Sequence, residues 1–348
     1  MQINNIEYRK LGAAGIKVPV MGIGTVAWGE KLVGYGEKFT RDDLFNAYKT
    51  SLDAGLNFFD TSESYGKGVS EQLLGEFHRQ DGRPIVVATK FSPAKIYDPS
   101  TRFSPKDIVS TLDGSLKRLG MDKVDLYQLH YPVARHKLNN YLDAMAETVK
   151  SGKAKAVGVC NFNTELMKYA HEYFAKQNIQ LVSNQVGYNL LHRLPETNGM
   201  LTACEDLDVT LIAILPLAEG VLTGKYRVGG DSYPSNLRNL AKVTQLDIFK
   251  DGDHSPLMRR LFTKPYMLQR EKLESLFEAM DMISNKYNAT ISQVALNWLI
   301  ASNPLVIPIP GEKNAMQAAS NAATLSWKLT RQEFESISQA ERAIRESL

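Results

Sequence analysis

The sequence predicts an α/β protein with a (β/α)8 barrel of the TIM type, and two observations carry this prediction. Eight short apolar runs, rich in β-branched residues, lie between about residues 19 and 310, and each is short enough to form a buried parallel strand. Amphipathic segments with recognisable start and stop residues separate the runs. Such alternation is typical of a barrel or of an open doubly wound sheet, and eight strands favour the barrel.

The expected strands share this apolar character and occupy residues 20–24, 57–59, 85–89, 124–129, 156–160, 179–184, 209–215 and 305–309. The helices between them are bounded by capping residues. Thr40, with Asp43 three residues later, has the pattern of an N-cap, and Gly55 ends that helix. Ser104 predicts the start of a second helix and Gly120 its end. Similar helices are expected at residues 138–152, 163–175 and 290–302.

One segment interrupts the alternation. Residues from about 219 to 269, after the seventh strand, are rich in Gly, Ser, Asn, Asp and Arg, which predicts a long loop. Loops of this length in compact domains usually have a function or are disordered. No repeat or linker divides the 348 residues, so we expect a single domain over residues 1–348.

Composition excludes several classes of function. A net charge of +3 without clustered Lys and Arg gives no basis for a nucleic-acid or membrane partner, and no apolar segment reaches the length of a membrane helix. The two cysteines, Cys160 and Cys204, lack metal-type spacing, and the N-terminus lacks a secretory signal, which favours a reducing, cytoplasmic location. Only His130 among six histidines follows a strand, so neither a metal site nor a metal-dependent hydrolase is expected. No pattern indicates an oligomeric state.

Polar or hinge residues follow six of the expected strands. They are Asp60, Lys90, His130, Asn161, Gln185 and the pair Pro310 and Gly311. Each has a structural explanation when taken singly: a turn cap for Asp60, a solvent-reaching lysine for Lys90, a satisfied histidine under a loop for His130. In a barrel, however, these strand ends meet at one face, where active sites lie. Their convergence therefore predicts a catalytic site.

The residue types fit one kind of chemistry. Tyr65 follows Asp60 on the same loop, and a tyrosine titrates near pH 10, so it needs a neighbouring cation to exchange a proton readily. Lys90 supplies that charge and Asp60 can hold Lys90 in place. His130 can donate a hydrogen bond to a substrate oxygen or share in proton transfer. This set suits the protonation of a carbonyl oxygen while a hydride arrives at its carbon.

Two glycine-containing stretches are candidates for a phosphate site. GIGTVA, residues 22–27, matches the dinucleotide fingerprint of a doubly wound sheet, but the glycine-rich WGEKLVGYGEK follows where that motif requires a helix. PIPGEKNAMQ instead places Gly311 and Lys313 at the start of a helix after the eighth strand, where backbone amides attract phosphate.

These motifs resemble the aldo-keto reductase superfamily over nearly the whole chain. FFDTSESYGKGVSEQLLG is similar to that family's signature, and ATKF, LYQLH, GVCNF and SNQVGYN fit the same pattern. The resemblance implies NADPH-dependent reduction of an aldehyde or ketone to an alcohol. It implies that Tyr65 is the general acid and that Asp60, Lys90 and His130 complete a catalytic tetrad.

The resemblance also implies a cofactor site for NADPH, with NADH as the alternative. Asn161 and Gln185 would hold the nicotinamide carboxamide, and Gly24 and Thr25 would lie beside the cofactor with Asp60. The diphosphate would be lined by Leu217, Glu219 and Lys225. The adenosine and its 2'-phosphate would be surrounded by Gly311, Lys313, Gln317 and Asn321.

The chain departs from the family pattern at several positions. Ile214 stands where an aromatic residue usually stacks on the nicotinamide, and Glu312 lies beside the expected phosphate site, where a carboxylate would repel phosphate. Cys160 and Ser320 also differ from the usual Ser and Glu. The loss of the aromatic residue leaves open a second function, an NADP(H)-binding sensor with slow turnover, like the potassium-channel β-subunits. Trp28 and Tyr131 are expected to shape the substrate pocket.

Overall fold

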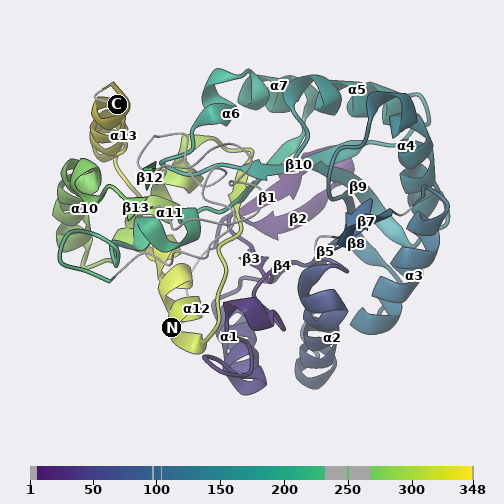
Figure 1. Cartoon of the computed structure of the whole chain (residues 1–348), viewed down its shortest axis with the longest axis horizontal. Helices are drawn as coiled ribbons and strands as arrows, with labels where there is room; N and C mark the ends of the chain where they lie inside the picture. The colour runs from purple at the N-terminus through teal and green to yellow at the C-terminus, as the bar shows by residue number, and fades with distance from the viewer. Residues whose placement is uncertain (1–5, 96–97, 103, 232–248, 251–266, 347–348) are drawn as a thin grey trace.

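The structure is a computed structural model that describes residues 6–95, 98–102, 104–231, 249–250 and 267–346. Eight parallel strands form one sheet in the order β14-β11-β10-β9-β8-β5-β4-β3, with helices around it (Figure 1). The two edges of the sheet meet, because the amides of Gly22 and Gly24 donate to the carbonyl oxygens of Pro308 and Pro310, each at 3.0 Å. The sheet is therefore a closed barrel, and the predicted (β/α)8 fold is confirmed.

The barrel strands are β3 (Ile23–Gly24), β4 (Phe58–Asp60), β5 (Val86–Phe91), β8 (Val124–Leu129), β9 (Ala154–Cys160), β10 (Leu181–Gly187), β11 (Thr210–Ile214) and β14 (Val306–Pro308). All eight overlap the runs expected from the sequence. The described helices are α1 (Arg41–Asp53), α2 (Val69–Asp81), α3 (Asp107–Leu119), α4 (Arg135–Lys150), α5 (Thr164–Ala175), α6 (Leu194–Thr197), α7 (Met200–Leu207), α10 (Glu274–Tyr287), α11 (Ile291–Ser302), α12 (Ala315–Ala323) and α13 (Arg331–Glu346).

Short 3-10 helices and two-stranded sheets lie outside the barrel sheet. The described 3-10 helices are η1 (Gly12–Ala14), η2 (Lys31–Val33), η3 (Tyr65–Gly68), η4 (Ala218–Thr223), η5 (Arg270–Leu273) and η6 (Thr324–Ser326). Three two-stranded antiparallel sheets pair β1 (Tyr8–Leu11) with β2 (Ile16–Pro19), β6 (Ala94–Lys95) with β7 (Asp98–Arg102), and β12 (Phe249–Lys250) with β13 (Met267–Leu268). Residues 232–248 and 251–266 of the long loop expected at 219–269 lie outside the described residues.

The predicted helix caps are mostly confirmed. Thr40 and Asp43 form a capping box at the start of α1, and Gly120 ends α3 in the left-handed conformation. The prediction of Ser104 as an N-cap is wrong, because α3 begins at Asp107 with Lys106 as its N-cap. The Ser104 hydroxyl instead donates to the Asp107 carboxylate at 3.0 Å, so it caps no backbone amide of the first helical turn.

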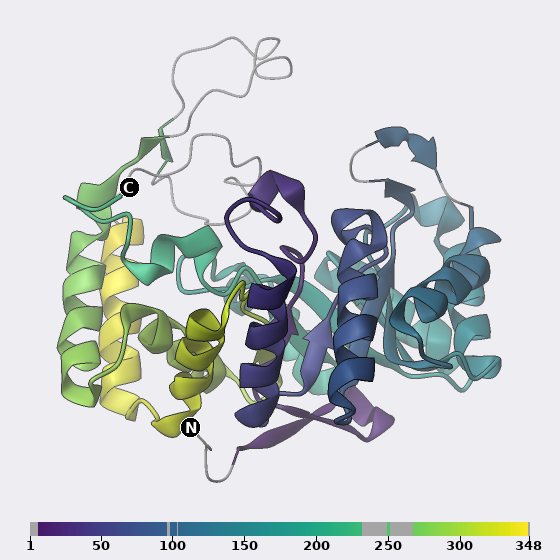
Figure 2. The same ribbon diagram turned by 90° about the horizontal axis from the view of Figure 1, so that it is seen from below.

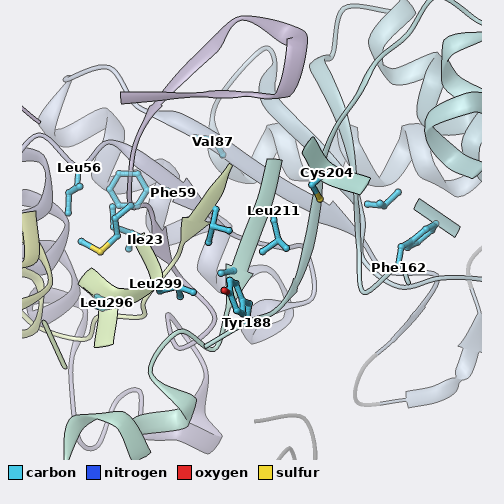
Figure 3. Packing of buried hydrophobic residues seen from close by; sticks show 14 of the residues in the cluster. Ile23, Leu56, Phe59, Val87, Phe162, Tyr188, Cys204, Leu211, Leu296 and Leu299 are labelled. Atoms are coloured by element: carbon cyan, nitrogen blue, oxygen red, sulfur yellow. The ribbon is translucent and has the colours of Figure 1, made fainter. Parts of the chain in front are cut away.

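Apolar side chains fill two layers. One lies inside the barrel and includes Phe58, Leu126 and Ile212, and a larger one lies between the barrel and its helices (Figure 3). Leu11 and Val18 of the β1-β2 hairpin belong to the inner layer, so the hairpin closes one end of the barrel (Figure 2). This hairpin was not predicted from the sequence.

Two further expectations are settled by the fold. The GIGTVA stretch runs from β3 into turns and η2, with no α-helix, so it is not a dinucleotide fingerprint. Trp28 does not line a substrate pocket, because it is fully buried, its ring packs against Phe59 and Phe77, and its indole N–H donates to the Glu312 carbonyl oxygen. Among the described helices, none combines the length and apolar character needed to cross a membrane.

Candidate active site

The four predicted catalytic residues gather at one end of the barrel. Asp60 ends β4, Lys90 lies near the end of β5, and His130 directly follows β8. These strands are neighbours in the sheet, with Asp60 paired to Ala88, so their carboxyl ends are side by side. Tyr65 begins η3, five residues after Asp60, and returns to the same place.

Lys90 is the centre of the cluster. Its ammonium donates to Asp60 Oδ1 at 2.5 Å, to the Thr61 carbonyl oxygen at 2.9 Å and to the Tyr65 hydroxyl at 3.2 Å. Lys90 and Asp60 are only 0% and 2% exposed. Three bonds use all three ammonium protons, and the charge is paired, as burial of a lysine requires.

The second carboxylate oxygen of Asp60 is also satisfied. It accepts hydrogen bonds from the side-chain amides of Gln128, at 3.1 Å, and Gln185, at 2.8 Å. Gln128 was not among the residues predicted from the sequence, although a signal was present. Residues two apart in a strand point to the same side, so Gln128 shares the inner face that His130 continues. The Asp60 carboxylate is therefore held by three donors, one from each of three other strands, and one of these donors is charged.

Burial and Lys90 set the protonation state of Tyr65. Burial raises the pKa of the phenol, the positive charge of Lys90 opposes this, and Asp60 adds to the rise. Lys90 therefore lowers the pKa of Tyr65, as expected from the sequence, but the effect of burial is larger and the net shift is upward. Burial also lowers the pKa of Lys90, but Asp60 and Tyr65 more than compensate, so its pKa lies above its ordinary value. At neutral pH the site holds a neutral phenol beside an ammonium ion.

His130 is neutral and held from two sides. Burial and the nearby Lys90 lower the pKa of the imidazole well below its ordinary value. Its Nδ1 lies 2.8 Å from Ser92 Oγ and 3.3 Å from Ser62 Oγ. Tyr65 approaches the ring edge-on with centroids 5.8 Å apart, and the half-buried Tyr131 stacks on it at 4.5 Å. Tyr131 is thus beside the site, as expected.

The predicted nicotinamide residues reach the same cluster. Asn161 Nδ2 donates to the His130 carbonyl oxygen at 3.1 Å, and its backbone has a φ of 62°, a left-handed conformation that asparagine tolerates. Gln185 is tied to Asp60 as described above. Gly24 lies at the barrel seam, paired with Asp60 and Gly311. Thr25 is fully buried, and its hydroxyl bonds to the Asp60 carbonyl oxygen at 2.9 Å and to Ser70 at 2.8 Å.

A positively charged cluster marks the opposite end of the expected cofactor site. Lys225 and Lys38 lower the pKa of Lys313, in addition to the larger effect of its burial, so the three ammonium groups lie close enough to repel one another. Within the described residues, none of the three forms an ion pair with a carboxylate. Uncompensated lysines beside the N-terminus of α12 fit a phosphate group.

Glu312 does not face this cluster, contrary to the expectation from the sequence. Its side chain is 1% exposed and accepts a hydrogen bond from Ser51 of α1 at 2.5 Å. Burial raises the pKa of the carboxyl to about 7, against the opposing effects of Ser51 and Asn321. The carboxylate expected to repel phosphate is therefore turned into the interface between α1 and α12.

The turn after β11 carries the remaining predicted residues. Leu217 precedes η4, and Glu219 has a left-handed backbone with a φ of 52°. Glu219 Oε2 is buried without a hydrogen-bond partner, and burial raises the pKa of its carboxyl. At the start of α12, Gln317 Oε1 accepts from the Lys313 amide at 2.9 Å, and the buried Asn321 side chain lies close enough to Glu312 to oppose the rise in the pKa of that carboxyl. The unpaired Glu219 oxygen fits a ligand that would satisfy it.

Comparisons with known proteins identify the family of this chain. A model of the Aldo/keto reductase family matches residues 20–342. The chain is 31% identical to pyridoxal reductase, chloroplastic, of Arabidopsis thaliana over 339 residues, which cover 94% of this chain and 84% of that protein. It is 28% identical to the aldo-keto reductase yakc [NADP(+)] of Schizosaccharomyces pombe, over 94% of this chain and 88% of that one.

A solved structure has the same architecture. It is a thermostable aldo-keto reductase, Tm1743, in complex with the inhibitor epalrestat, with a TM-score of 0.70 and 27% identity over 96% of this chain and 100% of that chain. The family match spans the barrel and every predicted catalytic position. This chain therefore belongs to the Aldo/keto reductase family, oxidoreductases that act on carbonyl and alcohol groups with nicotinamide cofactors.

Proposed function

We propose that this protein reduces a small-molecule aldehyde or ketone to an alcohol with NADPH, and that Tyr65 donates the proton. The observation that carries the proposal is the position of Lys90, whose ammonium bonds to Asp60 and the Tyr65 hydroxyl together. A reduced nicotinamide, when bound, supplies the hydride for the carbonyl carbon. The chain's own residues must then deliver a proton to the oxygen.

Each member of the tetrad has a defined part in that delivery. The Tyr65 hydroxyl transfers its proton to the developing alkoxide, and Lys90, 3.2 Å away, stabilises the phenolate that remains. Asp60 raises the pKa of Lys90, so that the ammonium stays charged, and holds it beside the Tyr65 hydroxyl. Neutral His130 orients the carbonyl oxygen without competing as an acid, since its pKa is lowered.

Replacing the phenol tests this assignment. Tyr65→Phe should lower the rate of NADPH oxidation, measured across a panel of aliphatic and aromatic aldehydes, by at least about a hundredfold, the usual scale for losing a general acid. Tyr8→Phe is the matched control, because Tyr8 is 51% exposed on β1. Equal rates for Tyr65→Phe and the wild type would remove Tyr65 from the proposed part.

The lysine cluster supports NADPH over NADH. Lys313→Gln should weaken NADPH binding about tenfold, the scale of one charge-assisted hydrogen bond, and leave NADH binding almost unchanged. Fluorescence titration with each cofactor measures both values, with the exposed Lys17→Gln as control. Equal losses for the two cofactors would show that Lys313 does not recognise the 2'-phosphate.

The alternative, an NADP(H)-binding sensor, makes a different prediction for the same experiments. Ile214 is partly buried and packs against the apolar layer inside the barrel, so an aliphatic side chain occupies the position expected of a stacking aromatic. Tight NADPH binding by the wild type without turnover of any aldehyde in the panel would favour the sensor and contradict the reductase.

A further inference from the structure

The hydroxyl of Ser92 lies against the ring of His130 in a buried position. Ser92 follows β5, two residues after Lys90, and is 1% exposed, while His130 is 4% exposed. Ser92 Oγ and His130 Nδ1 are 2.8 Å apart, the length of a good hydrogen bond. No step of the proposed mechanism uses Ser92, although its hydroxyl is the nearer of the two polar partners of His130 Nδ1.

The backbone around this contact is also held. The Ser92 amide donates to Glu63 Oε1 at 3.0 Å, and the His130 amide donates to the Phe91 carbonyl oxygen at 2.9 Å. These bonds join the loop after β4, the end of β5 and the end of β8. The serine and the imidazole therefore have little freedom to separate.

Counting donors and acceptors assigns the proton on the ring. A neutral imidazole carries one N–H, on either Nδ1 or Nε2, and the partner of one nitrogen decides which. The shortest contact of the Ser92 hydroxyl is with Nδ1, at 2.8 Å, which favours Nδ1 as the acceptor for its proton. The imidazole proton is then on Nε2, which has no partner among the described residues.

We propose that Ser92 is a positioning residue that donates a hydrogen bond to Nδ1 of His130, fixes the Nε2–H tautomer, and so makes His130 a hydrogen-bond donor to the substrate carbonyl oxygen. The last step rests on the proposed reductase function. The first two are properties of the free protein and are measurable without a substrate.

The competing arrangement would turn the Ser92 hydroxyl towards Glu63. The hydroxyl is close enough to help lower the pKa of that carboxyl, which burial raises. If the Ser92 hydroxyl donated its proton to Glu63, Ser92 Oγ would accept a hydrogen bond from a protonated Nδ1 of His130. The neutral ring would then carry no proton on Nε2, and Nε2 could not donate to a substrate. The geometry favours the first arrangement, because Glu63 Oε1 already accepts the Ser92 amide and the short contact of the hydroxyl is with Nδ1.

Nitrogen-15 NMR of the full chain, labelled at histidine, distinguishes the two arrangements. The two ring nitrogens of a neutral histidine have well-separated shifts, and His130→Asn identifies the signals among the six histidines. We expect the wild type to show a protonated Nε2 and an unprotonated Nδ1 at neutral pH. Ser92→Ala should give a mixture of tautomers, and Ser92→Thr, which keeps the hydroxyl, should restore the wild-type pattern. A protonated Nδ1 in the wild type would overturn the proposal.

Kinetics then tests the consequence for the reaction. Ser92→Ala should lower kcat about tenfold, the lower end of the effect of removing a partner that orients a functional histidine, while the Kd for NADPH stays unchanged. Ser110→Ala, an exposed serine on α3, is the matched control. An unchanged kcat in Ser92→Ala would refute the positioning role. A wild type that reduces no carbonyl would instead refute the proposed function, and the NMR result would still decide the tautomer.

Discussion

At the scale of single residues, burial and the charges in contact with a group together decide the charge state of Lys90 and Glu312. Lys90 keeps its charge because Asp60 is in contact with it, whereas Glu312 has only hydroxyl and amide neighbours to oppose its burial. The same physical effect therefore leaves one buried group ionised and another close to half-protonated at neutral pH.

Glu312 makes the stability of the fold depend on pH. Burial raises the pKa of its carboxyl from 4.5 to about 7, so between these values the folded state binds a proton that the unfolded chain has released. The free energy of unfolding must then fall as pH rises through this window. Glu312→Gln keeps an acceptor for Ser51 but does not titrate. From about pH 5 to about pH 8, the wild type should lose about 2 kcal/mol relative to the variant.

Urea unfolding of both proteins at the two pH values measures this difference. A gap between wild type and Glu312→Gln that does not change with pH would show that Glu312 remains ionised inside the fold.

The residues of the site could be predicted only as far as strand ends reveal them. Asp60, Lys90 and His130 follow apolar runs, so their convergence was visible in the sequence. The direction of Glu312 was not, because a residue at a helix start can face either way and its partner Ser51 is 261 positions distant along the chain. Ser92 and Ser62 were missed for a similar reason, since serines near turns usually serve local backbone bonds.

At the scale of elements, helix α1 supports the end of the barrel where we propose that the cofactor binds. It packs along α12, and Ser51 of α1 is bonded to Glu312 just before α12 begins. The start of α1 is fixed by its capping box, in which the Asp43 amide donates to Thr40 Oγ1 at 3.3 Å and Asp43 accepts from the Thr40 amide at 2.8 Å.

Removing this cap should destabilise the fold measurably. Thr40→Ala should lower the free energy of unfolding by about 1 kcal/mol, the usual effect of losing an N-cap hydroxyl, and Thr40→Ser should cost less because it keeps the oxygen. Urea denaturation gives both values. Equal losses in the two variants would mean that the hydroxyl bond contributes nothing.

Elements with a clear hydrophobic pattern could be predicted from the sequence, and elements without such a pattern could not. The eight barrel strands are continuous apolar runs, whereas β1 has the sequence YRKL, with three exposed or half-exposed residues and only Leu11 buried. Arg9 of that strand donates to the Asn303 and Ile300 carbonyl oxygens near the end of α11. Such contacts between distant parts of the chain leave no local pattern.

At the scale of the whole molecule, the two ends of the barrel differ: one end is closed by apolar packing and the other carries the candidate active site. One end is closed by the β1-β2 hairpin, which places apolar side chains in the interior. The other end collects Asp60, Tyr65, Lys90 and His130 from segments spread over 71 positions, numbers 60 to 130 of the chain. The proposed NADPH-dependent reduction requires this second end to unite a hydride donor, a proton donor and a substrate.

Transfer of a labelled hydrogen tests that requirement most directly. The protein is mixed with NADPH carrying deuterium at the reactive C4 position and with an aldehyde, and the product is analysed by mass spectrometry after a single turnover. We predict an alcohol that contains one deuterium from the cofactor with the wild type, and almost none in the same time with Tyr65→Phe. Bound, unreacted NADPH and unlabelled aldehyde with the wild type would contradict the account.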